Sequence, residues 1–130
     1  MGDKLRVSCT VCSFERELRV GKGLLYTKPG SYLIESEIAS KQMQNNLFQR
    51  MEGPCVEVRA NREIYRCEKC NRVMDCLSIS IVNGKKSYKT KYRCPRCNKT
   101  MTVVEMRTGE YPCPNCEEGK LFVEKVGTWD

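Results

Sequence analysis

Hydrophobic and polar residues alternate with a period of two along several short stretches of the chain. In residues 13–20 the apolar side chains of Phe14, Leu18 and Val20 fall on one face. A strand places alternate side chains on opposite faces, so this pattern predicts a strand with one buried side. Three further stretches have a strand-like composition: 55–59, 102–106 and 120–126.

A β-hairpin around Asn83-Gly84 is the clearest predicted element. Both turn residues tolerate positive φ, and alternating runs flank them. With Asn83 and Gly84 as the turn, Val82 lies opposite Lys85, Ile79 opposite Tyr88, and Asp75 opposite Tyr92. One face then carries Leu77, Ile79, Ile81, Tyr88 and Tyr92, and the other Ser78, Ser80, Ser87, Lys89, Lys91 and Arg93. We therefore expect both tyrosines to pack in the core.

Residues 36–51 predict the single helix of the chain. Their apolar residues recur at near-helical spacing: Ile38, Met43, Leu47 and Met51. Ser36 is a suitable N-cap, and Gly53-Pro54 is a suitable stop. The helix would lie in an insertion of about residues 21–54.

The composition calls for stabilisation beyond a hydrophobic core. Hydrophobic residues are 40% of the 130, aromatic residues are 8%, and ten residues are cysteine. The N-terminal residues are polar, and no apolar stretch approaches the roughly 18 residues of a membrane span. We therefore expect an intracellular, cytoplasmic protein in a reducing compartment, without membrane association, whose thiols bind metal.

Eight of the cysteines form Cys-x-x-Cys pairs, and histidine is absent. Thiolates suit tetrahedral Zn²⁺, so the pairs predict two structural, all-cysteine zinc sites. An internal repeat supports duplicated units, because residues 65–74 match residues 92–101. Cys55 and Cys76 remain outside the pairs and are expected to be small apolar residues. The predicted zinc ligands are Cys9, Cys12, Cys67, Cys70, Cys94, Cys97, Cys113 and Cys116.

On these motifs the chain resembles the zinc-ribbon superfamily with rubredoxin-like knuckles. The match is closest over residues 92–126, where two Cys-Pro-x-Cys knuckles precede a strand-like run from Gly119 to Val123. The resemblance implies two zinc ribbons, each a β-hairpin with a third strand, in a small β-rich zinc protein with one inserted α-helix. It implies a fold and leaves the function open.

Two assignments of the cysteine pairs to the ions are possible. The sequential assignment joins Cys9/Cys12 to Cys67/Cys70, and Cys94/Cys97 to Cys113/Cys116; it is the one preferred. The nested assignment joins the two inner pairs and the two outer pairs, and the hairpin register favours it to some extent. The sequential assignment divides the chain into a first ribbon (1–75), a joining basic hairpin (76–93) and a second ribbon (94–130).

Positive charge gathers in one part of the chain. The formal net charge is +7, and two zinc tetrathiolates would lower it to about +3. No acidic residue occurs from Cys76 to Val104. This run indicates nucleic-acid binding, although some of its members could offset the charge of the zinc sites. The candidate nucleic-acid contacts are Lys85, Lys86, Lys89, Lys91, Arg93 and Arg96.

The sequence gives little indication of catalysis. Histidine is missing, no phosphate-binding glycine loop occurs, and a four-cysteine zinc site has no open position for substrate. We therefore expect no enzyme activity and no small-molecule substrate. The favoured function is binding of RNA or DNA, in transcription or translation, through the lysine-rich hairpin. The alternative is a zinc-stabilised adaptor that docks onto a larger complex such as RNA polymerase or the ribosome.

Overall fold

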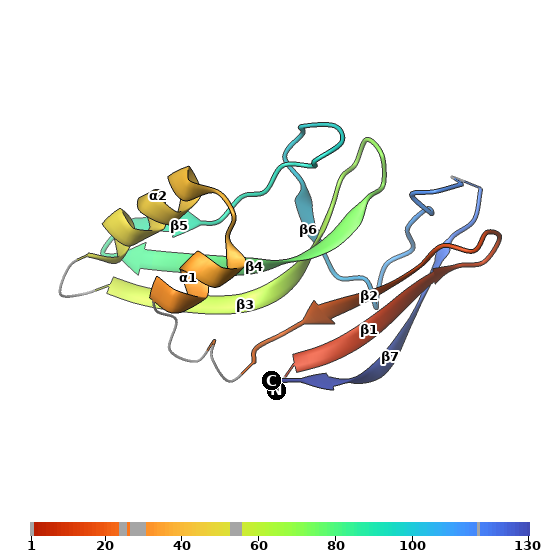
Figure 1. Cartoon of the computed structure of the whole chain (residues 1–130), viewed down its shortest axis with the longest axis horizontal. Coiled ribbons are helices and arrows are strands. Elements are labelled where there is room, and N and C mark those ends of the chain that lie inside the picture. The colour runs from red at the N-terminus through yellow and green to blue at the C-terminus, as the bar shows by residue number, and fades with distance from the viewer. Residues whose placement is uncertain (1, 24–25, 27–30, 53–55, 117) are drawn as a thin grey trace.

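The computed structural model describes residues 2–23, 26, 31–52, 56–116 and 118–130. Two antiparallel sheets lie side by side, and two helices cover one face of the larger sheet (Figure 1). The helices are α1 (Ser31–Glu37) and α2 (Lys41–Met51). The strands are β1 (Gly2–Cys9), β2 (Glu15–Val20), β3 (Val56–Arg66), β4 (Val73–Asn83), β5 (Lys86–Lys89), β6 (Thr102–Val104) and β7 (Leu121–Trp129).

The smaller sheet has the order β2-β1-β7 and joins the two ends of the described chain. Gly2 pairs with Trp129, and Cys9 pairs with Leu121. Leu5 and Val7 of β1 are buried on the same face as Leu18 of β2, because each strand alternates apolar and polar residues. The strand expected in residues 13–20 is confirmed over Glu15–Val20.

The larger sheet has the order β5-β4-β3-β6, with a long hairpin of β3 and β4 at its centre. These strands pair along their whole length, from Val56 opposite Asn83 to Arg66 opposite Val73. The strands predicted at 55–59, 102–106 and 120–126 are present as β3, β6 and β7, although β3 extends to Arg66. Sequence patterning missed this extension because polar residues interrupt the apolar ones.

The register of the hairpin between β4 and β5 differs from the prediction by two residues. Asn83 pairs with Lys86 and Ile81 with Tyr88, so Gly84 and Lys85 form the turn. Gly84 has φ +63°, a conformation that glycine adopts without strain. A shift of two preserves the faces of the strands, and Tyr88 packs against the predicted core with Ile81.

Tyr92 does not share this face, which corrects the predicted arrangement. Strand β5 ends at Lys89, and the hydroxyl of Thr90 accepts a hydrogen bond from the backbone N–H of Ile79 at 3.1 Å. Beyond that point the chain no longer follows β4. Tyr92 packs edge-to-face on Tyr65, with ring centroids 5.0 Å apart, in a different buried cluster.

The predicted single helix is two helices that meet at residues 38–40. Ser40, not Ser36, is the N-cap of the longer helix, because its hydroxyl accepts a hydrogen bond from the backbone N–H of Met43 at 3.2 Å. Ser36 lies inside α1 and donates to the carbonyl of Leu33. The predicted stop at Gly53-Pro54 lies outside the described residues.

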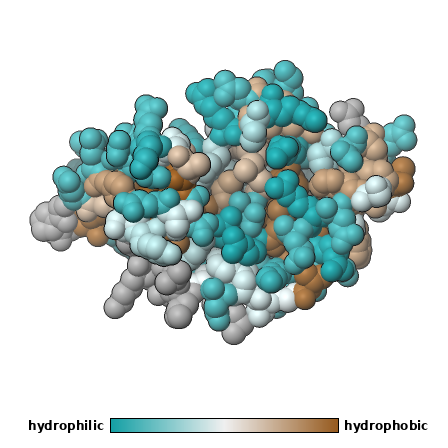
Figure 2. All heavy atoms as spheres, in the orientation of Figure 1, coloured by the Kyte–Doolittle hydropathy of each residue, from teal (hydrophilic) through white to brown (hydrophobic). Residues whose placement is uncertain are grey.

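The buried side chains form three clusters. The first lies between the helices and the larger sheet and includes Ile34, Leu47, Ile79 and Ile81. The second joins the two sheets, and the third surrounds the inner cysteine pairs. Hydrophilic residues cover most of the face in Figure 2. Among the described residues, no helix has the length and apolar character needed to cross a membrane.

The sheet topology corrects the predicted division of the chain. Strand β7 pairs with β1 in one sheet, while residues 56–104 supply the other. The units are therefore nested and do not follow one another at residues 75 and 94. The physical reason is that the apolar residues Leu121 and Val123 complete the buried face begun by Leu5 and Val7.

Candidate metal centres

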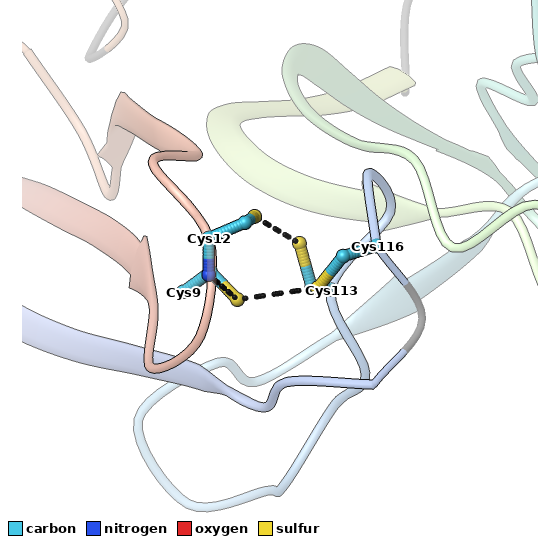
Figure 3. Close-up of side chains that lie close together, drawn as sticks. All are labelled: Cys9, Cys12, Cys113 and Cys116. Carbon is cyan, nitrogen blue, oxygen red and sulfur yellow. Dashed lines mark hydrogen bonds between the residues drawn. The ribbon is translucent and has the colours of Figure 1, made fainter.

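The two outer cysteine pairs meet at one end of the smaller sheet. The Sγ atoms of Cys9 and Cys116 lie 3.6 Å apart, as do those of Cys12 and Cys113 (Figure 3). All four sulfurs lie within 4.8 Å of one another. A disulfide would require about 2.05 Å. An ion with thiolate bonds of about 2.3 Å separates the sulfurs of a tetrahedron by about 3.8 Å, so this group could hold one metal ion.

The two inner cysteine pairs form a second group of the same kind. Cys67, Cys70, Cys94 and Cys97 bring their sulfurs within 4.8 Å of one another. The Sγ atoms of Cys70 and Cys94 lie 3.6 Å apart. Cys67 and Cys94 are buried, whereas Cys70 and Cys97 are partly exposed.

These groups show that the preferred sequential assignment is wrong and that the nested assignment is right. The turn from β3 to β4 carries Cys67 and Cys70, and β6 returns to β3 just after Cys94 and Cys97. The pairing of β1 with β7 brings the outer pairs together. Sheet pairing thus decides which pairs share an ion, and sequence spacing does not.

The internal repeat has a structural cause in the shape of the inner knuckles. Asn71 and Asn98 each follow a Cys-x-x-Cys pair and have φ values of 65° and 58°. The N–H of Asn71 donates to the carbonyl of Cys67 at 2.8 Å, and Asn98 donates to Cys94 at the same distance. Asparagine is one of few residues that adopt this left-handed conformation readily. The repeated Cys-x-x-Cys-Asn sequence therefore encodes a repeated turn.

Backbone N–H groups favour thiolate at particular sulfurs. Cys9 Sγ accepts hydrogen bonds from the N–H groups of Cys12 and Val11, both at 3.3 Å. The hydrogen bond from Cys12 is the main reason that the pKa of Cys9 is lowered to about 6. Burial raises the pKa of Cys67, but the N–H groups of Cys70 and Lys69 outweigh burial and lower that pKa to about 7.

The neighbouring thiols cannot all ionise together unless a cation is present. The backbone hydrogen bond from Phe14 lowers the pKa of Cys12, yet burial and the thiols of Cys9 and Cys113 raise it to about 12. Burial, followed by the thiol of Cys70, raises the pKa of Cys97 to about 12. Four thiolates around one point need a divalent cation to offset their mutual repulsion, and the donor set therefore fits a metal ion.

Comparison with protein-family models, curated proteins and solved structures gave no match.

Five of the six predicted nucleic-acid contacts are exposed and form no salt bridge in the part of the chain that the structure describes. They are Lys85, Lys86, Lys91, Arg93 and Arg96. Lys85 and Lys86 lie at the turn that leads into β5, and Arg96 lies within the knuckle of Cys94 and Cys97. The sixth, Lys89, differs because its Nζ lies 3.0 Å from a carboxylate oxygen of Glu63.

The second strand of the predicted lysine-rich hairpin is an edge of the larger sheet. Strand β5 covers only Lys86–Lys89, and β4 pairs with it along that length. Lys91 and Arg93 follow the end of the strand. The basic residues therefore lie on a segment that runs from the hairpin turn to the second metal centre, which we call the basic segment (residues 85–96).

Sequence reasoning missed a groove beside this segment. A cavity of about 440 Å³ lies between the junction of the two helices and residues 91–93. Its lining residues are Ile38, Ala39, Ser40, Gln42, Met43, Lys91, Tyr92 and Arg93. The signal in the sequence was the break between the helices, which the periodicity of the apolar residues concealed.

The remaining cysteine of the described chain has no place in either group. Cys76 is buried against Tyr65 and Met101, and burial raises the pKa of its thiol to about 11. It packs as a small apolar side chain. Cys55 lies outside the described residues.

Proposed function

We propose that this chain is a non-catalytic protein with two structural Zn²⁺ ions that binds nucleic acid through its basic segment. The observation that carries the proposal is the row of five exposed cations between Lys85 and Arg96. Salt bridges occupy other basic residues of the described chain, such as Arg59, Arg62 and Arg107. Cations without a protein partner are available to phosphate groups.

Zinc is the ion that best fits the donor chemistry. Both groups offer four cysteine sulfurs and no oxygen or nitrogen donor, the set found in closed structural zinc sites. Such sites have no open position for a substrate, which supports a structural and not a catalytic role. Elemental analysis of purified protein should find two zinc ions per chain, and a different metal would overturn this part.

The groove beside the basic segment suits one nucleotide base. Its lining includes the apolar residues Ile38 and Met43 and the cations Lys91 and Arg93. Tyr92 also lines the groove, so a base inserted there would meet an aromatic ring. Its phosphates would lie beside the two cations. This arrangement supports binding of a single strand, whose bases are accessible.

The adaptor alternative has less support from the helices. Its docking surface would be the apolar face of the predicted helix. Of that face, Ile38 and Leu47 are buried, and Met43 and Met51 are partly buried and pack against the same cluster, which includes Ile79 and Ile81 of the larger sheet. The exposed faces of both helices are mainly polar, apart from Tyr32.

A salt series tests the proposal. Zinc-loaded protein is titrated with single-stranded RNA and with duplex DNA at several salt concentrations. One variant replaces Lys85, Lys86, Lys91 and Arg93 with glutamine. A matched control replaces Lys22, Arg59, Lys120 and Lys125, which gives the same net charge but leaves the basic segment intact.

For the wild type, the logarithm of the binding constant should fall linearly with the logarithm of the salt concentration. For each phosphate that the variant no longer neutralises, the slope should decrease by about 0.9 with duplex DNA or about 0.7 with a single strand. The control should retain most of the wild-type slope. An absence of wild-type binding at low salt, or an equal reduction of the slope in both variants, would contradict the proposal.

A further inference from the structure

A small cavity lies between the two metal centres and is distinct from the groove beside the helices. Its volume is about 100 Å³. Its lining residues are Phe14, Arg16, Arg72, Val73, Arg96, Pro114 and Asn115. A single water needs about 10–15 Å³ of such space, so the cavity has room for a group of several atoms.

Residues beside or within all four Cys-x-x-Cys motifs line this cavity. Phe14 and Arg16 follow the first pair, and Arg72 follows the second. Arg96 lies inside the third pair and Asn115 inside the fourth. The cavity is therefore assembled only when the nested pairing brings both centres together. No sequence motif unites these four segments.

All the charged residues of the lining are positive. Three arginines line the cavity, and no acidic residue is among its lining residues. Arg16, Arg72 and Arg96 form no salt bridge in the described chain, unlike Arg6, Arg19 and Arg62. The Nε of Arg72 is also buried without a hydrogen-bond acceptor. Three cations around one space repel one another unless an anion offsets their charge.

We propose that this three-arginine cavity binds a phosphate group. A guanidinium offers paired N–H donors that match the oxygens of phosphate, and the side-chain amide of Asn115 offers a further donor. Binding of phosphate at this cavity does not depend on the proposed function. Only the wider role of the site rests on that function, in which the phosphate belongs to the backbone of a bound nucleic acid. Arg96 belongs to both the cavity and the basic segment, so a strand on that segment leads into the cavity.

The competing explanation is that the arginines only offset the negative charge of the metal centres. This role would account best for Arg72, which follows the second pair, and Arg96, which lies inside the third. Arg16 lies on β2, opposite Val7 and outside the cysteine knuckles. It is therefore the residue whose substitution best separates phosphate binding from stabilisation of the metal.

The test measures binding of inorganic phosphate to the full, metal-loaded chain by calorimetry at constant ionic strength. The variants are Arg16→Gln, Arg72→Gln and Arg96→Gln, and Arg59→Gln is the control because Arg59 is exposed and does not line the cavity. We expect saturable binding of one phosphate by the wild type. Each cavity variant should weaken it about tenfold or more, and the control should not.

Metal content is measured for every variant, and Arg16→Gln decides the result if either knuckle variant fails to retain its metal. Absence of saturable phosphate binding to the wild type would overturn the proposal. So would equal binding by Arg16→Gln and the wild type. A loss of metal from the arginine variants without any phosphate binding to the wild type would establish the counter-charge role instead.

A second arm separates this proposal from the proposed function. A single-stranded oligonucleotide is added in competition with inorganic phosphate. Displacement of phosphate by the oligonucleotide supports both proposals. Phosphate binding without oligonucleotide binding would leave the cavity as a site for a free phosphate and would overturn only the nucleic-acid function. Oligonucleotide binding without phosphate binding, unchanged in Arg16→Gln, would overturn only the cavity.

Discussion

The Nζ of Lys89 lies 3.0 Å from Oε2 of Glu63. Lys89 lies on the edge strand β5 and Glu63 on β3, so this salt bridge spans strand β4, which lies between them. The hydroxyl of Ser78 donates to the same oxygen at 2.9 Å. In the sequence, no carboxylate occurs near Lys89 on its own segment. The order of the strands supplies one, and Lys89 is therefore less available to phosphate than its neighbours.

Replacing Lys89 with methionine should raise the pKa of Glu63. Burial raises this pKa in the wild type, but Lys89 and Ser78 outweigh burial, and the pKa lies below its ordinary value. Ionised Glu63 therefore stabilises the fold above its unfolded pKa of about 4.3. That contribution is lost as the pH falls through the lower, folded pKa.

A carboxyl titration by NMR should show a higher midpoint for Glu63 in Lys89→Met and no change in Lys86→Met. An unchanged Glu63 midpoint in both variants would contradict the salt bridge.

Double substitutions of cysteine should reveal which pairs share an ion. Cys12 and Cys113 belong to one group, and Cys70 belongs to the other. Cys12→Ser with Cys113→Ser damages one site twice, so the protein should retain one metal ion. Cys12→Ser with Cys70→Ser damages both sites and should retain neither. Native mass spectrometry counts the ions, and the reverse result would restore the sequential assignment.

Gly119→Ala should weaken the outer metal centre while the inner centre stays loaded. A Cβ at this position would lie 2.3 Å from the Sγ of Cys9, which is closer than atoms can approach. The N–H of Gly119 also donates to Cys116 Sγ at 3.4 Å. Chelator competition should remove one metal ion at about tenfold lower chelator concentration than in the wild type.

Gly127→Ala is the matched control for this experiment. A Cβ at Gly127 would meet only the side chain of Lys4, at an ordinary distance of 3.9 Å. Metal retention in this variant should equal that of the wild type. If Gly119→Ala also behaves like the wild type, the close approach to Cys9 has no effect on the site.

Arg62→Leu should destabilise the packing of helix α1 against the larger sheet. Nε of Arg62 donates to the carboxylate of Asp75 at 3.3 Å, and Nη1 forms a salt bridge with Glu37 of α1. Removal of the buried Arg62 guanidinium deprives the carboxylates of Asp75 and Glu37 of this positively charged partner. Because Asp75 and Glu37 are 19% and 28% exposed, we expect a loss of about 2–3 kcal/mol, below the upper range for buried pairs.

Urea unfolding of the metal-loaded protein measures this loss. The exposed pair of Arg59 and Glu57 provides the comparison, because substitution of Arg59 should cost less than about 1 kcal/mol. Equal effects of the two substitutions would show that burial adds nothing to the interactions of Arg62.

Local patterns in the sequence were sufficient for several elements. Alternation of Phe14 and Leu18 predicted β2, and the Asn83-Gly84 signal predicted the β4–β5 hairpin. The apolar stripe from Ile38 to Met51 predicted which residues face the core, even though the helix breaks at Ser40. The break escaped prediction because a capping serine resembles any other polar residue on a helix surface.

The sequence by itself determined that eight cysteines act as four pairs, because each knuckle is a local turn built from adjacent residues, and the absence of histidine predicted two four-sulfur groups. It also determined that cations gather between Lys85 and Arg96. Only the tertiary structure decided which cysteine pairs meet, which lysine faces Glu63, and that three arginines share one cavity. These relationships depend on strand order and register, and both are set by the total apolar surface buried between segments far apart in the chain.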